Sequence, residues 1–255
     1  MHKPRIIVIE GGDGAGKSTA KRWIIEHLLA TQPTITAPTF DATEFEQTHP
    51  HRSATANDFS SHPAQFILTI DEPSYADTGA VIRQKVFEGP INQEELAHLY
   101  ARDRHNIYDR LVTPYIEGGG RWVVQSRGLL SSLTYQATTI AKEKHRSLIE
   151  VRNELLRIPG NSLELGYASF MDILVLCTSV EIGRKRLVSN RPSRDQFEND
   201  SELQRRVQAG LVNDLLQDPF REKGARFHML NASNDPPVVH QKILDALTKL
   251  IEDAH

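Results

Sequence analysis

Short apolar runs alternate with longer segments of helical periodicity along this chain. The first run, residues 5–9, is rich in β-branched side chains and ends in a glycine-rich loop. This pattern predicts a strand that is buried on both faces, as in a parallel sheet. The next segment, residues 17–30, places Trp23, Ile24 and Leu28 at helical spacing. A strand, a glycine loop and a helix therefore open the chain.

The alternation continues to the C-terminal end. Further strands are predicted at residues 65–70, 121–125, 172–177 and 225–230. Helices are predicted at residues 77–87, 93–117, 180–189, 200–216 and 237–252, with two more inside 131–157, whereas 159–161 are expected to break the chain. Strands that alternate with helices indicate an α/β fold, here a P-loop NTPase-type parallel sheet of about five strands flanked by helices.

Residues 31–64 depart from this pattern. The segment is rich in threonine, proline and histidine, and a structureless connection of this length is uncommon in a compact domain. We expect a partly ordered insertion, with aromatic anchors at Phe40, Phe45 and Phe59. Its histidines are candidate metal ligands (His49, His51 and His62), but the lack of cysteine and of paired helical spacing favours a solvated linker.

Composition narrows the class of protein. The 255 residues suffice for one domain, 1–255, that carries the insertion and a polar lid at 190–199. A 39% hydrophobic content excludes disorder throughout, and a net charge of −3 gives no basic footprint for nucleic acid. The single cysteine, Cys177, lies in an apolar run, which favours a buried structural thiol over a nucleophile. No signal peptide or membrane span is recognisable, so we expect a cytoplasmic protein with no membrane partner.

The glycine loop carries the strongest chemical signal. Residues 11–18 contain the full Gly-x-x-x-x-Gly-Lys-Ser pattern of a phosphate-binding loop, in the strand–loop–helix context that such a loop requires. Lys17 is expected to reach the β- and γ-phosphates of ATP, and the Ser18 hydroxyl to bind Mg²⁺. The predicted ATP site comprises Gly11, Gly12, Asp13, Gly14, Ala15, Gly16, Lys17, Ser18 and Thr19.

Two other classes of P-loop protein fit less well. A GTPase would carry an Asn-Lys-x-Asp segment, which this chain lacks. An ATPase motor would have a strand that ends in acidic residues, whereas the strand at 121–125 is followed by Ser126 and Arg127. These observations favour a kinase that uses Mg-ATP.

Several segments, taken in order, resemble those of thymidylate kinases. They are the loop Glu-Gly-Gly-Asp-Gly-Ala-Gly-Lys-Ser-Thr at 10–19, Glu-Pro-Ser at 72–74 with Gly-Ala-Val-Ile-Arg at 79–83, Leu-Tyr-Ala-Arg-Asp-Arg at 99–104, Ser-Arg at 126–127 with Ser-Ser-Leu-Thr-Tyr-Gln at 131–136, and an arginine-bearing lid with Arg191 and Asp-Gln-Phe-Glu at 195–198. None of the matches after the phosphate loop is specific by itself, but five matches in the order of the family are specific together.

The resemblance implies roles for the acceptor site. Arg127 would grip the acceptor phosphate with the help of Arg83, while Tyr100 stacks on a pyrimidine and Arg104 hydrogen-bonds its edge. Tyr135 would close the sugar side. The remaining predicted contacts with the acceptor are Glu72, Pro73, Ser131, Ser132 and Gln136. Outside this register, Tyr100 would be ordinary core and Arg104 an exposed salt-bridge partner.

Phosphoryl transfer also needs positive charge over the moving group. The loop contains no arginine, so the resemblance assigns this role to Arg191 or Arg194 of the lid, although a solvated charge run is the alternative. Three residues depart from the family pattern: Ser126 replaces an aspartate, Ser74 a glycine and Gly128 an aromatic. We expect Ser126 to move metal handling to Asp13 or Glu72, or to lower activity.

The sequence thus predicts Mg-ATP-dependent phosphorylation of dTMP to dTDP. Lys17, Arg127, the lid arginines and Asp13 are the candidate catalytic residues, and Ser18 is the candidate metal ligand. Two alternatives stay open: a related kinase for another deoxynucleotide or a modified pyrimidine, and a weakly active nucleotide-binding regulatory protein. A homodimer is implied by resemblance alone.

Overall fold

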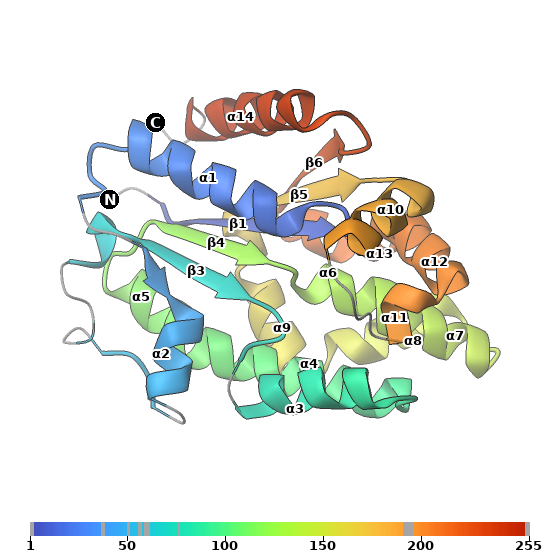
Figure 1. Ribbon diagram of the computed structural model, residues 1–255. Coiled ribbons are helices and arrows are strands. Elements are labelled where there is room, and N and C mark those ends of the chain that lie inside the picture. Colours follow the sequence, from blue (N-terminus) through green and yellow to red (C-terminus); the bar gives the residue numbers. More distant parts are fainter. Residues whose placement is uncertain are drawn as a thin grey trace.

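Six parallel strands form one open sheet in the order β2-β3-β4-β1-β5-β6 (Figure 1). The computed structural model describes residues 3–36, 39–49, 52–55, 58, 62–75, 77–190 and 196–252. The strands are β1 (Arg5–Gly11), β2 (Phe40–Asp41), β3 (Ile67–Asp71), β4 (Trp122–Ser126), β5 (Met171–Cys177) and β6 (Arg226–Asn231). The predicted α/β class and parallel sheet are confirmed.

Helices cover both faces of the sheet, so most side chains of its central strands are apolar (Figure 1). In β1, Ile7 and Ile9 belong to one buried cluster, whereas Ile6 and Val8 belong to the other. The first cluster is covered by α1 (Lys17–Thr31) and α14 (Pro236–Glu252). This alternation along one strand is what the apolar run at the start of the chain encodes.

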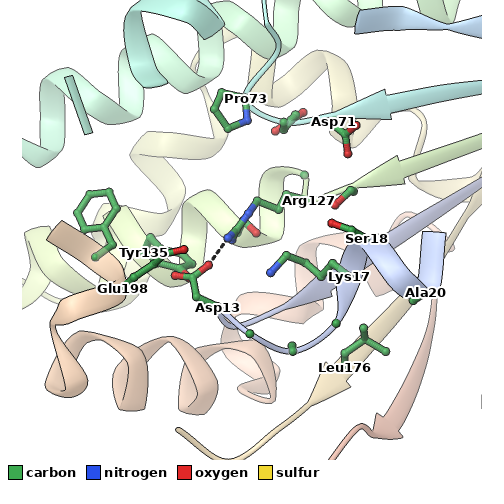
Figure 2. A pocket seen from close by; sticks show the side chains of 18 of the residues that line it. Asp13, Lys17, Ser18, Ala20, Asp71, Pro73, Arg127, Tyr135, Leu176 and Glu198 are labelled. Carbon is green, nitrogen blue, oxygen red and sulfur yellow. Dashed lines mark hydrogen bonds and ion pairs between the residues drawn. The ribbon is translucent and has the colours of Figure 1, made fainter. Parts of the chain in front are cut away.

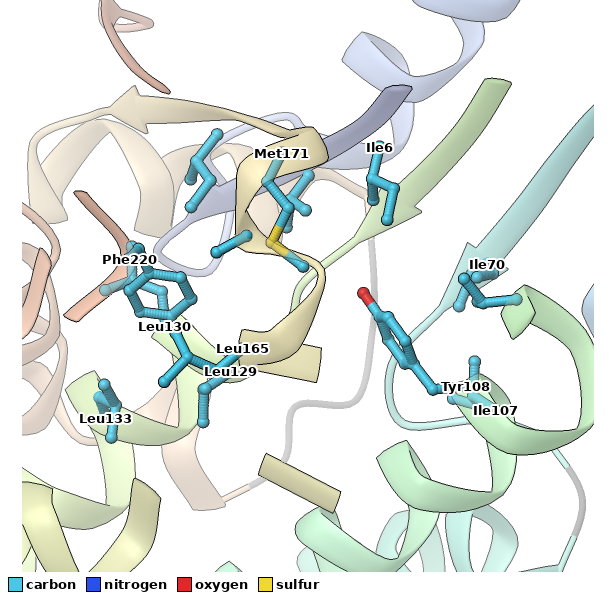
Figure 3. Close-up of a cluster of buried hydrophobic side chains, with 14 of the residues drawn as sticks. Ile6, Ile70, Ile107, Tyr108, Leu129, Leu130, Leu133, Leu165, Met171 and Phe220 are labelled. Atoms are coloured by element: carbon cyan, nitrogen blue, oxygen red, sulfur yellow. The ribbon is translucent and has the colours of Figure 1, made fainter. Parts of the chain in front are cut away.

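The larger cluster lies on the opposite face and includes Tyr108, Leu129 and Phe220 (Figure 3). The helical segments around it are α2 (Ala42–Thr48), α4 (Gln93–Ile107), the π-helical turn η3 (Tyr108–Val112), α5 (Thr113–Glu117), α6 (Leu129–Ser132), the π-helical turn η4 (Leu133–Ala137), α7 (Thr138–Glu143), α8 (Leu148–Leu156), α9 (Pro159–Gly166), α12 (Ser201–Leu211) and α13 (Asp214–Arg221).

The other helices are α3 (Asp77–Glu88), α10 (Val180–Asn190) and α11 (Gln196–Asn199). The 3₁₀ turns are η2 (Pro63–Gln65) and η5 (Ala168–Phe170).

The sheet has six strands where about five were predicted. The additional strand, β2, lies in the segment 31–64 and pairs with β3 through Phe40↔Leu68 and Asp41↔Thr69. With two residues, it is too short to show either an apolar run or an alternation. β2 lies at the edge of the sheet because it pairs with β3 across a long connection. Such a pairing leaves no signal in the local sequence.

Two helical predictions were wrong. Residues 159–161 do not break the chain: Pro159 is the first residue of α9, a position where its missing N–H costs nothing. The region 200–216 is two helices, because α12 ends at Leu211 and α13 begins after Asn213 caps its first turn. Between 131 and 157, the two predicted helices are present: α6, η4 and α7 follow one another without a break, and α8 comes next.

The segment 31–64 is anchored by aromatic rings. Phe40 lies 5.5 Å from Phe45 and 5.7 Å from Phe66 between ring centroids, and Phe45 is buried. The side chain of Asp41 caps α2 by accepting a hydrogen bond from the Thr43 amide. Phe59 and His51 lie outside the described residues.

Two histidines of this segment, His49 and His62, have local partners. His49 stacks on Phe45 with 4.9 Å between ring centroids, and His62 Nδ1 accepts a hydrogen bond from the Ala64 amide. Within the described ranges, no three histidine, cysteine, aspartate or glutamate side chains gather as a metal site.

Cys177 is half-buried at the end of β5, and burial raises the pKa of its thiol. No helix in the described part of the chain combines the length and the apolar composition that crossing a membrane requires.

Candidate active site

A cavity of about 790 Å³ lies beyond the carboxyl ends of β1, β3 and β4. Ligands of open α/β sheets bind at this edge. The sequence-predicted residues that line it are Asp13, Gly14, Ala15, Gly16, Lys17, Ser18, Thr19, Glu72, Pro73, Arg83, Tyr100, Arg104, Arg127, Ser131, Ser132, Tyr135 and Gln136. Gly11 and Gly12 begin the loop behind the lining, while Arg191 and Arg194 lie outside the described residues.

The glycines of the loop have a steric reason to be there. Gly14 and Gly16 adopt φ angles of 74° and 94°, in the left-handed region that favours glycine. A Cβ on Gly14 would also lie 2.1 Å from the carbonyl oxygen of Gly183 in α10. The loop is therefore held against α10, with the N-terminus of α1 open to an anion.

Lys17 turns back over the loop. Its ammonium donates hydrogen bonds to the carbonyl oxygens of Gly11 at 2.9 Å and Gly12 at 2.8 Å. Burial, together with the nearby guanidinium of Arg127, lowers the pKa of Lys17 to about 7. Bound phosphates would supply the missing negative charge and restore the charged form of Lys17.

Arg127 faces the loop from the end of β4, where its backbone has a φ of 65°. Its amide donates to the carbonyl of Ile9 in β1 at 3.0 Å, and its guanidinium forms an ion pair with Asp13 (Figure 2). Burial opposes ionisation of Asp13, but Arg127 and then Lys17 outweigh it and lower the pKa of this carboxyl to about 2. Two cations and one carboxylate thus meet in the cavity.

Asp13 is fixed by two further side chains. Tyr135 donates its hydroxyl to Asp13 at 3.0 Å, and Gln204 Nε2 donates to the same carboxylate at 2.7 Å. The Asp13 amide donates back to Gln204 Oε1 at 3.2 Å. Sequence reasoning missed Gln204, because it lies in α12, 191 residues from Asp13, and belongs to no motif.

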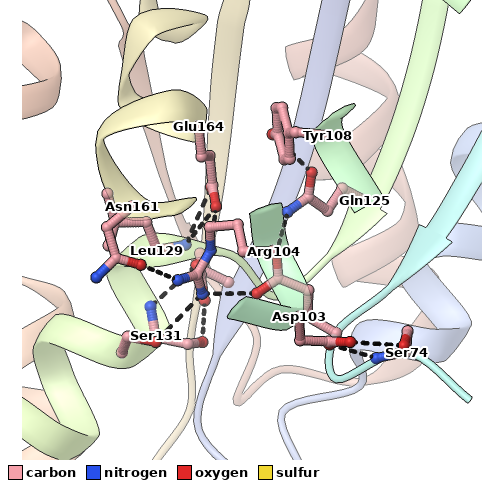
Figure 4. Close-up of polar contacts among 12 residues, drawn as sticks. Ser74, Asp103, Arg104, Tyr108, Gln125, Leu129, Ser131, Asn161 and Glu164 are labelled. Carbon is pink, nitrogen blue, oxygen red and sulfur yellow. Dashed lines mark hydrogen bonds and ion pairs between the residues drawn. The ribbon is translucent and has the colours of Figure 1, made fainter. Parts of the chain in front are cut away.

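Arg104 lies at the buried end of the cavity and has protein partners (Figure 4). Its Nη2 donates to Glu72 at 2.7 Å, its Nε contacts the carboxylate of Glu164, and its Nη1 donates to Asn161. The Arg104 side chain is 0% exposed, so its salt bridges are buried, unlike the exposed one considered from the sequence. Burial outweighs the attraction of Arg104 and raises the pKa values of both Glu72 and Glu164.

Arg83 braces the turn that follows β3. Its Nε donates to the Ser74 carbonyl at 3.0 Å, its Nη2 donates to the Pro73 carbonyl, and its guanidinium lies 3.7 Å from the centre of the Tyr75 ring. The hydroxyl of Ser74 donates to Asp103 at 2.6 Å. The peptide bond before Pro73 is cis.

Comparison with known proteins agrees with this geometry. No family model matches the chain. A thymidylate kinase of Rhizorhabdus wittichii is 26% identical over 97% of this chain and 98% of its own length. A probable thymidylate kinase of Thermococcus kodakarensis is 26% identical over 96% of this chain and 98% of its own, and a thymidylate kinase of Chlorobium limicola is 23% identical over 95% and 94%. The chain is similar to thymidylate kinases over nearly its whole length. The resemblance in the short segments thus extends over nearly the whole chain.

Gly128 is one departure from the thymidylate kinase pattern that the structure explains. A Cβ on Gly128 would lie 2.6 Å from Glu164 Oε1. Both oxygens of Glu164 accept from the amide of Leu129, at 3.0 and 3.1 Å. The buried carboxylate of α9 therefore takes the room that a side chain after Arg127 would need.

The serines of the predicted acceptor site have polar partners. Ser131 donates its hydroxyl to Glu10 at 2.5 Å, and Ser132 accepts from Arg104 at 3.2 Å. Burial raises the pKa of Glu10 to about 7. Tyr100 is half-buried and lines the cavity.

Further lining residues come from α10 and α11. Arg186 of α10 donates to the carbonyls of Ala232 at 3.0 Å and Asn234 at 3.4 Å. Phe197 and Glu198 of α11 also reach the cavity, and the Phe197 ring lies 6.0 Å from that of Tyr135. Arg186 belongs to no matched segment, so only the fold identifies it, whereas Phe197 and Glu198 lie in the lid segment that the sequence matched.

Proposed function

We propose that this protein transfers the γ-phosphoryl group of Mg-ATP to dTMP, which gives ADP and dTDP. One observation carries the proposal: the phosphate loop with Lys17 and the guanidinium of Arg127 open into the same cavity as Tyr100. The names of the full-length relatives support thymidylate as the acceptor.

The charges of the cavity fit two phosphate groups. Lys17 and the N-terminus of α1 favour the phosphates of the donor, whereas Arg127 favours the phosphate of the acceptor. A nucleoside monophosphate carries about two negative charges near neutral pH. In our scheme this phosphate competes with Asp13 for Arg127, so Asp13 keeps the guanidinium oriented until the acceptor binds. A dianionic acceptor needs no side-chain base.

The residues around the loop also fit magnesium. Hydroxyl and carboxylate oxygens are the ligands that Mg²⁺ prefers, and Ser18 and several carboxylates line the cavity. When bound, the ion would neutralise charge on the β- and γ-phosphates. The proposal assigns the positive charge over the transferred group to the lid arginines, Arg191 and Arg194.

Turnover on a panel of nucleoside monophosphates tests the proposal. With Mg-ATP, we expect kcat/KM to be highest for dTMP. Turnover of dCMP or of a nucleoside without turnover of dTMP would contradict it, and ATP binding without transfer to any acceptor would point to a regulatory protein. The proposal includes a homodimer, which sedimentation tests. A monomer in solution would contradict this part of the proposal.

Arg127→Lys should lower kcat/KM for dTMP at least about 100-fold, because a lysine cannot grip phosphate through two parallel hydrogen bonds. Steady-state kinetics measure this loss. Arg146→Lys is the matched control, since Arg146 pairs with Glu154 on the surface and does not line the cavity. Equal activities of the two variants would contradict the proposed role of Arg127 in binding the acceptor phosphate.

A further inference from the structure

Asp71 is a carboxylate at the site that no family segment includes. It ends β3, lines the cavity together with Ser18 and Ser126, and keeps 34% of its side chain exposed. In P-loop NTPases, an aspartate commonly shares Mg²⁺ with the serine or threonine of the loop. Here the strand next to β1 ends in Ser126, which is neutral.

The register of the sheet places Asp71 beside that serine. Asp71 pairs with Ser126 across β3 and β4, and Ser126 pairs with Ile9 across β4 and β1. Residues paired in a parallel sheet point to the same face, and Ile9 belongs to the cluster that α1 covers. The Asp71 side chain therefore points toward α1, the helix in whose first turn Ser18 lies (Figure 2).

An ion pair confirms this direction. Lys21 of α1 donates to Asp71 Oδ2 at 2.9 Å and to the carbonyl of Ile70 at 3.1 Å. Lys21 is one helical turn beyond Ser18. The pair holds the carboxylate against the start of α1, while no hydrogen bond within the described residues engages Oδ1.

The other carboxylates of the cavity have different surroundings. Asp13 is held by Arg127, Tyr135 and Gln204, and Glu72 by Arg104 and Gln125. Glu198 comes from α11, on the side of the cavity that Phe197 also lines. Among the described residues, Asp71 is thus the lining carboxylate that lies on the α1 face next to position 126.

We propose that Asp71 is the carboxylate that binds the magnesium ion of Mg-ATP together with Ser18, in place of an acidic residue at position 126. The proposal rests on the proposed function only in that the donor is a magnesium nucleotide. It also gives Lys21 a role, because the ammonium keeps Asp71 oriented and balances its charge when no metal is bound.

Equilibrium titration with a fluorescent ATP analogue, in Mg²⁺ and in EDTA, tests the proposal. Asp71→Asn should bind the analogue about tenfold more weakly than wild type in Mg²⁺. In EDTA, it should bind equally or more tightly, since the substitution removes a negative charge that faces the phosphates. Bound Mn²⁺, followed by electron paramagnetic resonance, should weaken in parallel.

Two further variants sharpen the test. Adding Ser126→Asp to Asp71→Asn should restore the magnesium preference, because the register places the new carboxylate beside the lost one. Lys21→Met removes the ion pair but keeps the carboxylate, so its magnesium preference should remain. If Asp71→Asn loses affinity equally in Mg²⁺ and EDTA, or loses none, the proposal is overturned. If these results hold but dTMP is not phosphorylated, the proposed function fails and this inference stands.

Discussion

At the scale of single residues, the cationic groups of the cavity have partners within the protein before any ligand binds. Arg127 pairs with Asp13, and the ammonium of Lys17, whose pKa is lowered to about 7, donates to two backbone carbonyls. Phosphate binding replaces these internal contacts. Proton exchange should therefore accompany nucleotide binding.

Nucleotide binding should take up as much as one proton between pH 7 and pH 9. Free Lys17 is partly neutral in this range because its pKa is about 7, and the bound phosphates raise that pKa and recharge the ammonium. Affinity should consequently fall as the pH rises above 7. Calorimetric titration in buffers of different ionisation enthalpy measures the uptake. Lys17→Arg should abolish it, and unchanged uptake in that variant would assign the proton to another group.

At the scale of elements, the acceptor side depends on the close approach of α4 and α9. A Cβ on Gly160 would lie 1.7 Å from the carbonyl oxygen of Ala101. The same two helices carry Arg104 and its partners Asn161 and Glu164. Separation of the helices would therefore loosen the buried ion pairs as well as the packing.

Gly160→Ala should lower the free energy of unfolding by about 3 kcal/mol, because the added methyl group forces the two backbones apart. Denaturation in urea measures this change. Gly166→Ala, at the exposed end of the same helix, adds a Cβ with no heavy atom within 4 Å. That control should be neutral or stabilise by up to about 1 kcal/mol, and equal losses in both variants would exclude the steric explanation.

At the scale of the whole molecule, a buried carboxylate joins the segment 31–64 to the rest of the fold. Glu46 of α2 is 3% exposed. Burial, and then the charge of Asp103 in α4, raise its pKa to about 8 against the attraction of Arg110 in η3, while Asp77 of α3 adds repulsion. Folding thus keeps Glu46 protonated near neutral pH.

The free energy of unfolding should fall as the pH rises from about 4.5 to about 8. In that window the native state holds a proton on Glu46 that the unfolded chain has released, so raising the pH favours unfolding. Glu46→Gln should remove this part of the pH dependence. Between pH 5 and pH 8, the free energy of unfolding of the variant should rise by on the order of 2 kcal/mol relative to that of wild type. Glu44→Gln, exposed on the same helix, should leave the slope unchanged. A wild-type slope in the Glu46 variant would show that another group titrates.

The local sequence predicted much of the fold because a strand that is buried on both faces appears as a short, continuous apolar run. The run at residues 5–9 and the periodic helix after it became β1 and α1, and the glycine loop between them borders the cavity. The two-residue β2 and the helix that begins at Pro159 escaped prediction. Pairing with β3 decides β2, whereas the start of α9 follows a local rule, since proline is favoured at the first position of a helix.

The sequence by itself determined the phosphate loop, the parallel α/β class and the resemblance to thymidylate kinases, because these depend on residues close together in the chain. Only the tertiary structure decided which charges meet: Asp13 with Arg127 and Gln204, and Arg104 with Glu164. It also placed Asp71 level with Ser126. Charge pairing acts over a few ångströms of space, and folding alone brings residues that are distant in the sequence within that range.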